Sequence, residues 1–182
     1  MENMNADQLI QFLIENGRSW IEAQRNHHRP TARTLTDSEK AALRPFFEES
    51  ILNLSWVKRV PVIENPGFYA ELRAMGIPPP LDFTTMEGIT FIDTVLISDR
   101  EHPQHEPLAS LLFHELIHVV QYALLGLPAF IDRYVRGWVE AGQDYDRIPL
   151  EQDAYALQRR FQQQPNQGFS VKSEVRRRLG LI

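Results

Sequence analysis

The sequence predicts an α+β fold that is mostly helical, with a small sheet beside one apolar helix. Helix start and stop signals recur along most of the chain, whereas only two segments combine β-branched residues with loose alternation. The first strand is expected from Trp56 to Ile63. The stronger one is Ile89 to Ile97, which Asp93 interrupts with a bulge or a tight turn. At 182 residues, the chain is most simply one domain spanning residues 1–182.

Local signals place the helices in order. A capping box at Asn5 opens a helix that is expected to end before Asn26, and a second box at Thr36 opens another, which Pro45 should kink or split. Pro107 suits a helix start, and Gly126 is a natural stop. Further helices are expected at Pro66–Met75, at Phe130–Glu140, after Pro149 to about Gln163, and near Phe169–Leu179.

Composition narrows the classes of protein. The formal net charge of −5 argues against non-specific binding to nucleic acid, and the basic run Arg176–Arg178 is expected to be a solvated helix face. The chain has no cysteine, which excludes disulfides, thiolate zinc sites and cysteine nucleophiles. Met1–Asp7 is polar and acidic, and no apolar stretch approaches the roughly 20 residues that span a bilayer. We therefore expect a cytoplasmic protein with no membrane or nucleic-acid partner.

The central motif is His114-Glu115-Leu-Ile-His118, the H-E-x-x-H signature of zinc hydrolases. On a helix the two histidines lie one turn apart on one face, where both imidazoles can bind one divalent ion. Glu115 lies beside them, within reach of a water on that ion. The flanking residues are apolar, so the three polar side chains would be buried at high cost unless they had a partner. A metal ion meets that need, and ordinary hydrogen bonds within the core are the alternative.

A catalytic zinc site normally takes a third protein ligand and keeps one position for water. The extended metzincin pattern fails, because Gln121 stands where a glycine is needed and Leu124 where the third histidine would be. No histidine follows His118. The third ligand is therefore a carboxylate, a water or an upstream histidine.

Two glutamates compete for the third position. Glu140 follows His118 by 22 residues but lies at the expected exposed end of its helix. Glu151 lies in the first turn of the next helix, and Ala154 on the same face is small enough to allow that helix to approach closely. We therefore prefer Glu151 and keep Glu140 as the alternative.

The run Phe113–Tyr122, together with Ile148–Tyr155, resembles the small bacterial H-E-x-x-H domains that are grouped with the glutamate-type zincins and described as zinc metallopeptidases. The resemblance covers roughly residues 85–165, the expected core of the metal site. It implies Zn²⁺ as cofactor, a zincin-like α+β core with the strand near Ile89–Ile97 beside the helix, and Glu115 as the catalytic carboxylate. The ligands that it implies are His114, His118 and Glu151. It implies little about the substrate.

These features lead to the hypothesis of a zinc-dependent peptidase or related amide hydrolase acting on a peptide or protein. Glu115 would accept a proton from the attacking water and pass it to the leaving amine. Tyr145 is the candidate donor to the developing oxyanion, with a packing or loop tyrosine as the alternative. Gln121, one turn beyond His118, is expected to orient a ligand or a backbone group, with contact to the substrate as the alternative. An open edge of the strand at 89–97 would suit an extended peptide.

Two other hypotheses stay open. A zinc-stabilised binding or regulatory domain without turnover would fill the fourth coordination position with a side chain such as His102 or His105. A helical domain with a chance motif would leave His114 and His118 in ordinary hydrogen bonds.

Overall fold

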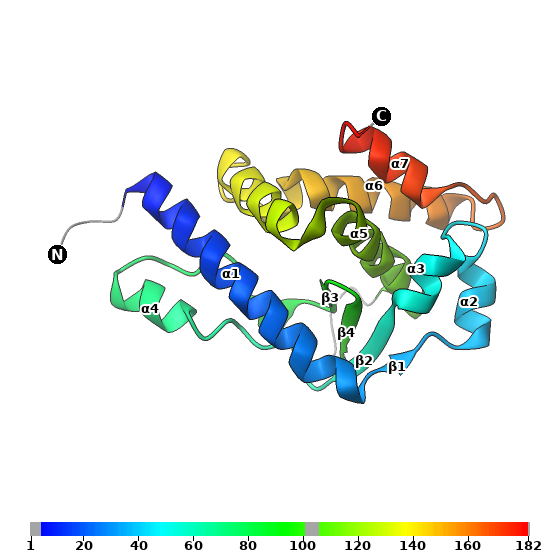
Figure 1. Cartoon of the computed structure of the whole chain (residues 1–182), viewed down its shortest axis with the longest axis horizontal. Coiled ribbons are helices and arrows are strands. Elements are labelled where there is room, and N and C mark those ends of the chain that lie inside the picture. Colours follow the sequence, from blue (N-terminus) through cyan, green and yellow to red (C-terminus); the bar gives the residue numbers. More distant parts are fainter. Residues whose placement is uncertain (1–4, 101–105, 182) are drawn as a thin grey trace.

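The computed structural model describes residues 5–100 and 106–181, most of which lie in helices (Figure 1). The α-helices are α1 (Ala6–His28), α2 (Asp37–Leu43), α3 (Glu49–Leu54), α4 (Tyr69–Ala74), α5 (Leu108–Glu140), α6 (Pro149–Gln163) and α7 (Val171–Arg178). The strands are β1 (Arg33–Thr34), β2 (Trp56–Val60), β3 (Gly88–Phe91) and β4 (Thr94–Ser98). Helix α5 runs through the middle of the molecule, in contact with α6 and α7 on one side and with β3 on the other. The expected α+β class, with its sheet beside the motif helix, is confirmed.

The sheet is mixed, with strand order β1-β2-β4-β3. Strands β2 and β4 are parallel, and β1 and β3 pair antiparallel to β2 and β4 respectively. The predicted β segment from Ile89 to Ile97 is interrupted at Asp93 as expected: a tight turn at Ile92 and Asp93 divides it into β3 and β4, which pair as an antiparallel hairpin. Strand β2 ends at Val60, before the expected Ile63.

The turn of this hairpin is anchored to α1. Ile92 has φ 63°, a strained value for a β-branched residue. Next to it, the buried Asp93 carboxylate accepts hydrogen bonds of 3.0 and 2.8 Å from Arg25 and lies 3.2 Å from Nε of Arg29. Both arginines lie at the C-terminal end of α1 or just beyond it, so the ion pairs fix that end of the helix against the sheet.

The helix boundaries follow most of the local signals. Both capping boxes form, at Asn5 and Thr36, and the chain around Pro45 separates α2 from α3. The first helix runs on through His28, so its expected end before Asn26 is wrong. At Gly126 the backbone leaves the helical conformation, with φ 72°, and the helix resumes directly afterwards as the second half of α5.

Helix α5 forms the centre of the hydrophobic core. Phe113 is fully buried and stacks on Phe161 of α6 at 4.3 Å between ring centroids. By length and apolar composition, α5 could cross a membrane, so the expectation that no stretch reaches that length is wrong. However, 72% of its most apolar window is buried inside the protein, as in the core helix of a soluble protein.

Candidate metal centre

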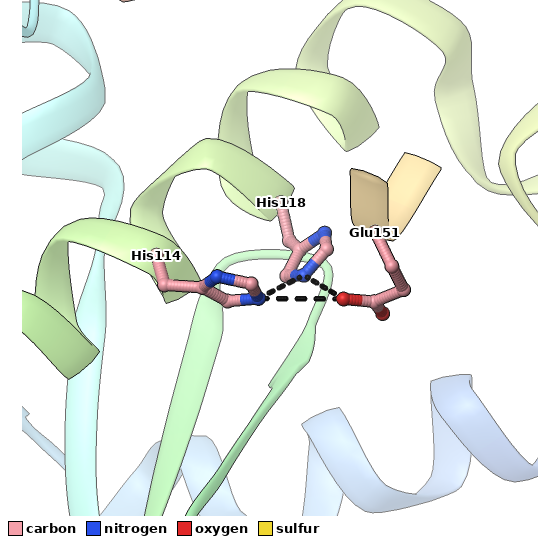
Figure 2. A group of neighbouring side chains, drawn as sticks. All are labelled: His114, His118 and Glu151. Atoms are coloured by element: carbon pink, nitrogen blue, oxygen red, sulfur yellow. Dashed lines mark hydrogen bonds and ion pairs between the residues drawn. The ribbon is translucent and has the colours of Figure 1, made fainter. Parts of the chain in front are cut away.

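Two helices supply the three predicted metal ligands. His114 and His118 project from successive turns of α5, and Glu151 reaches them from the first turn of α6 (Figure 2). All three residues are buried, with 3 to 6% of their surface exposed. The start of α6 approaches α5 closely at Gly137, where a Cβ atom would lie only 2.8 Å from Cδ of Pro149. This close packing carries Glu151 to the histidines.

The three candidate ligand atoms form a nearly equilateral triangle. The Nε2 atoms of His114 and His118 are 3.1 Å apart, and Oε2 of Glu151 lies 3.3 Å from the first and 3.4 Å from the second. Ligand atoms about 2.0–2.1 Å from a tetrahedral zinc ion are separated by about 3.3 Å. The triangle therefore has the size of one face of a zinc coordination tetrahedron.

Hydrogen bonds fix the proton position on His118. The side-chain amide of Gln121 donates from Nε2 to the carbonyl oxygen of Leu150 at 3.0 Å. Its oxygen therefore faces Nδ1 of His118 at 2.8 Å, so that Nδ1 must carry the proton and donate it. In the neutral ring, Nε2 then carries a lone pair directed into the triangle. The structure thus gives Gln121 the orienting contact that was expected of it.

His114 is held in the same way from α6. Its Nδ1 lies 3.0 Å from Oε1 of Gln158, whose Nε2 donates to Oγ of Ser110 at 3.0 Å. Both imidazoles thus direct Nε2 towards the other and towards the carboxylate. Two ring lone pairs and an anionic oxygen repel one another unless a cation lies between them.

The Glu151 carboxylate has one satisfied oxygen and one unsatisfied oxygen. Oε1 accepts a 2.8 Å hydrogen bond from the Tyr134 hydroxyl in the second half of α5. Oε2 is buried and has no hydrogen-bond partner within the described residues. A buried carboxylate oxygen without a partner is costly, and a metal ion would satisfy it.

The pKa values also indicate that the triangle attracts positive charge. Burial alone would raise the pKa of Glu151, but the two histidines hold it well below its ordinary value. Burial alone would lower the pKa of His118, yet the neighbouring Glu151 carboxylate raises it to about 9. A positive charge, as a proton or as a metal ion, is therefore favoured between these groups.

Glu115 lies beside the ligands and is positioned by β3. Its Oε2 accepts a 2.7 Å hydrogen bond from Thr90, and its Oε1 lies where a Cβ atom on Gly88 would be 2.6 Å away. Only glycine allows the strand to come this close to the carboxylate. Burial raises the pKa of Glu115 although the adjacent histidines lower it, which suits a group that must take up a proton.

Two cavities meet at this glutamate. One has a volume of about 120 Å³ and reaches His118 and Glu151; the other has a volume of about 490 Å³ and reaches His114. Glu115 and Tyr145 line both of them. The candidate metal centre is thus bordered by space on the side of the predicted catalytic carboxylate.

Tyr145 lies in a short 3₁₀ helix, Tyr145–Arg147, directly before α6. Burial raises the pKa of its hydroxyl well above the ordinary value, so the hydroxyl keeps its proton and can donate it in a hydrogen bond. Tyr145 lines both of the cavities that Glu115 lines, and its role as oxyanion donor stays a prediction. The competing ligand Glu140 is exposed at the end of α5, outside the ligand triangle. His102 and His105 lie outside the described residues.

Three residues of the site were not predicted: Thr90, Tyr134 and Gln158. Gln158 carries a usable signal, because it follows Glu151 by seven residues and so shares its helix face two turns later. Thr90 and Tyr134 carry no such signal. They reach the carboxylates of Glu115 and Glu151 because β3 and the part of α5 beyond Gly126 pack against the site.

Comparison of the chain with protein-family models, with curated proteins and with solved structures finds no match. The geometry of this centre is therefore the feature of the chain that indicates its function.

Proposed function

We propose that the protein is a zinc-dependent hydrolase that cleaves amide bonds, with peptides or proteins as its substrates. The observation that carries the proposal is the triangle of His114, His118 and Glu151. Its edges of 3.1 to 3.4 Å match a zinc tetrahedron, and Oε2 of its carboxylate has no hydrogen-bond partner in the described part of the chain. A face with three protein ligands leaves one position for water or substrate, as catalytic zinc sites do.

When bound, zinc would polarise the substrate carbonyl and lower the pKa of the attacking water to about 7. Glu115 then accepts the proton of that water and delivers it to the leaving amine. Thr90 holds the carboxylate in place through its 2.7 Å hydrogen bond. The Tyr145 hydroxyl, which keeps its proton, donates a hydrogen bond to the oxyanion.

The second edge of β3 has no strand paired to it among residues 5–100 and 106–181. Because β3 also contacts α5 and carries Gly88 and Thr90 against Glu115, an extended peptide added at this edge would pass close to the candidate centre. This supports a peptide as the substrate. The cytoplasmic location and the absence of nucleic-acid and membrane partners stay predictions from the sequence.

The competing function is a zinc-stabilised binding domain without turnover, in which His102 or His105 closes the fourth position. The cavities that meet at Glu115 favour the hydrolase, because a closed structural site has no need of space beside a buried carboxylate.

The test compares the wild type with Glu115→Gln, and with Glu140→Gln as a matched control on the same helix. Each protein is loaded with zinc, its metal content is measured, and hydrolysis of a broad peptide library is followed by mass spectrometry. We expect about one zinc per chain in all three, with activity reduced at least about 100-fold in Glu115→Gln alone. Zinc retained by a wild type that cleaves nothing would favour the binding domain. A wild-type protein that binds no zinc would contradict both the hydrolase and the zinc-stabilised binding domain.

A further inference from the structure

The cavity that reaches His118 and Glu151 differs in character from the metal centre beside it. Its walls come from α1, from the segment 66–86, from β3 and from the second half of α5. They are largely aromatic or aliphatic, and include Leu13, Trp20, Phe68, Phe83, Ile89 and Val135. Apart from tyrosines, the only ionisable side chains among its described lining residues are Glu115, His118 and Glu151, all at the candidate centre.

We propose that this cavity holds a large apolar group of the substrate, next to the bond that is cleaved. This inference rests on the proposed function and adds the substrate class to it. An engineered apolar cavity of about 150 Å³ holds benzene. The volume here, about 120 Å³, therefore suits a leucine, methionine or phenylalanine side chain. Burial of a charged side chain between these apolar walls would cost free energy, because the charge would lose its hydration without gaining a partner, whereas burial of an apolar group has no such cost.

The position of the cavity sets where the apolar group lies in the substrate. Glu115, His118 and Glu151 form the polar end of the cavity, so a side chain lying in it places its own backbone at the ligand triangle. The other cavity at the centre carries Asp82, Glu106 and Asp146 among its lining residues, and its surroundings are therefore acidic. Two such different environments on the two sides of Glu115 accommodate an apolar group on one side only.

The same chemistry has two sources: an apolar side chain of a peptide, or the acyl chain of an N-acyl amide. The test therefore uses matched substrates that differ at one position beside the scissile amide. The peptide arm carries Phe, Leu, Ala, Asp or Lys at that position, and the acyl arm compares N-octanoyl with N-acetyl amides. We expect kcat/KM for Phe or Leu to exceed that for Ala by about 10- to 100-fold, the range expected for burying one large apolar side chain. Preference within the acyl arm alone would identify an acyl chain as the occupant, and no preference in either arm overturns the inference.

A pair of variants tests the cavity itself. Val135→Phe fills part of it, whereas Val139→Phe makes the same change one turn further along α5, outside the lining residues. We expect Val135→Phe to reduce the preference for Phe over Ala at least tenfold, with Val139→Phe unchanged. Equal preference in both variants, with melting temperatures like that of the wild type, would contradict the assignment.

A binding measurement separates failure of this inference from failure of the hydrolase. Trp20 and Trp138 line the cavity, so tryptophan fluorescence can report its occupation in the zinc-free Glu115→Gln protein. N-acetylphenylalanine amide should bind at least about tenfold more tightly than N-acetylalanine amide. Selective binding without any hydrolysis by the wild type would refute the hydrolase and keep the apolar site. Hydrolysis by the wild type without selective binding of the phenylalanine amide would refute the apolar site and keep the hydrolase.

Discussion

Zinc should stabilise this fold, and most of the stabilisation should depend on Glu151. A ligand present at about a thousand times its Kd stabilises the folded state by about 4.1 kcal/mol. In a protein of this size, about 1 kcal/mol moves the melting temperature by about 2–4 °C. Zinc at that concentration should therefore raise the melting temperature by about 8–16 °C, and a chelator should reverse the rise.

The substitution Glu151→Gln keeps the side-chain volume and removes the charged corner of the ligand triangle. Loss of a residue that only supports a metal ligand weakens metal binding by up to about 100-fold. Loss of the ligand itself should weaken zinc binding by at least that factor. The same zinc concentration then reaches only about ten times the Kd, which corresponds to about 1.4 kcal/mol and a rise of about 3–6 °C.

The assay is thermal unfolding by circular dichroism with zinc and with chelator, for the wild type, Glu151→Gln and the exposed control Glu140→Gln. The quantity compared is the zinc-dependent shift within each protein, because the substitution also changes the metal-free cluster. Glu140→Gln should behave as the wild type. An equal shift in all three proteins, or a loss of the shift in Glu140→Gln, would refute the assignment of the third ligand.

Three further substitutions test the groups around the centre. Gly88→Ala places a Cβ atom 2.6 Å from Oε1 of Glu115, so we expect peptide hydrolysis to fall at least about tenfold at unchanged zinc content; Gly67→Ala, with open space around it, is the control. Tyr134→Phe removes the 2.8 Å hydrogen bond to Glu151 and should weaken zinc binding by about 10- to 100-fold, measured by competition with a chelator, and unchanged affinity would contradict its supporting role. Asp93→Asn should lower the free energy of unfolding, measured with urea at pH 7, by about 2 kcal/mol. This is less than the loss expected for a fully buried ion pair, because the arginine partners remain about one-third exposed. Burial raises the pKa of Asp93, but its arginine partners outweigh this and lower it below its ordinary value of 3.8. The carboxylate therefore stabilises the fold above about pH 4, and the difference between wild type and variant should disappear as the pH falls through the lowered pKa, whereas a constant difference would contradict this account.

Local rules predicted the fold where the determinants are local. Helix α6 lies where it was expected and ends at Gln163, and it includes Pro149 as its first residue, a position that proline suits. The end of α1 was missed because Asn26–His28 is polar and resembles a loop. In the structure this end of the helix is held by ion pairs from Arg25 and Arg29 to Asp93. Asp93 lies 68 residues from Arg25 in the sequence, and no pattern within α1 indicates that partner.

The site shows the same division. The helical spacing of His114 and His118 and the small Ala154 beside Glu151 were enough to predict that these three candidate ligand residues lie together. The hydrogen bond of Tyr134 to Glu151 could not be predicted from the sequence. It depends on how the chain redirects at Gly126, and a glycine signals a helix stop without fixing the direction in which the next helix leaves.

The candidate ligand residues and most walls of the apolar cavity come from different parts of the chain. Helices α5 and α6 hold the charged triangle inside the segment 85–165, where the packing of Gly137 against Pro149 leaves little freedom. Helix α1 and the segment 66–86 add walls to the cavity, and the Asp93 ion pairs hold one end of α1 in place. Substitutions in those walls should therefore change which substrate is cleaved while zinc content stays constant. Substitutions at the triangle should remove zinc and all cleavage together, and a wall variant that lost its metal would show that the two functions are not separable.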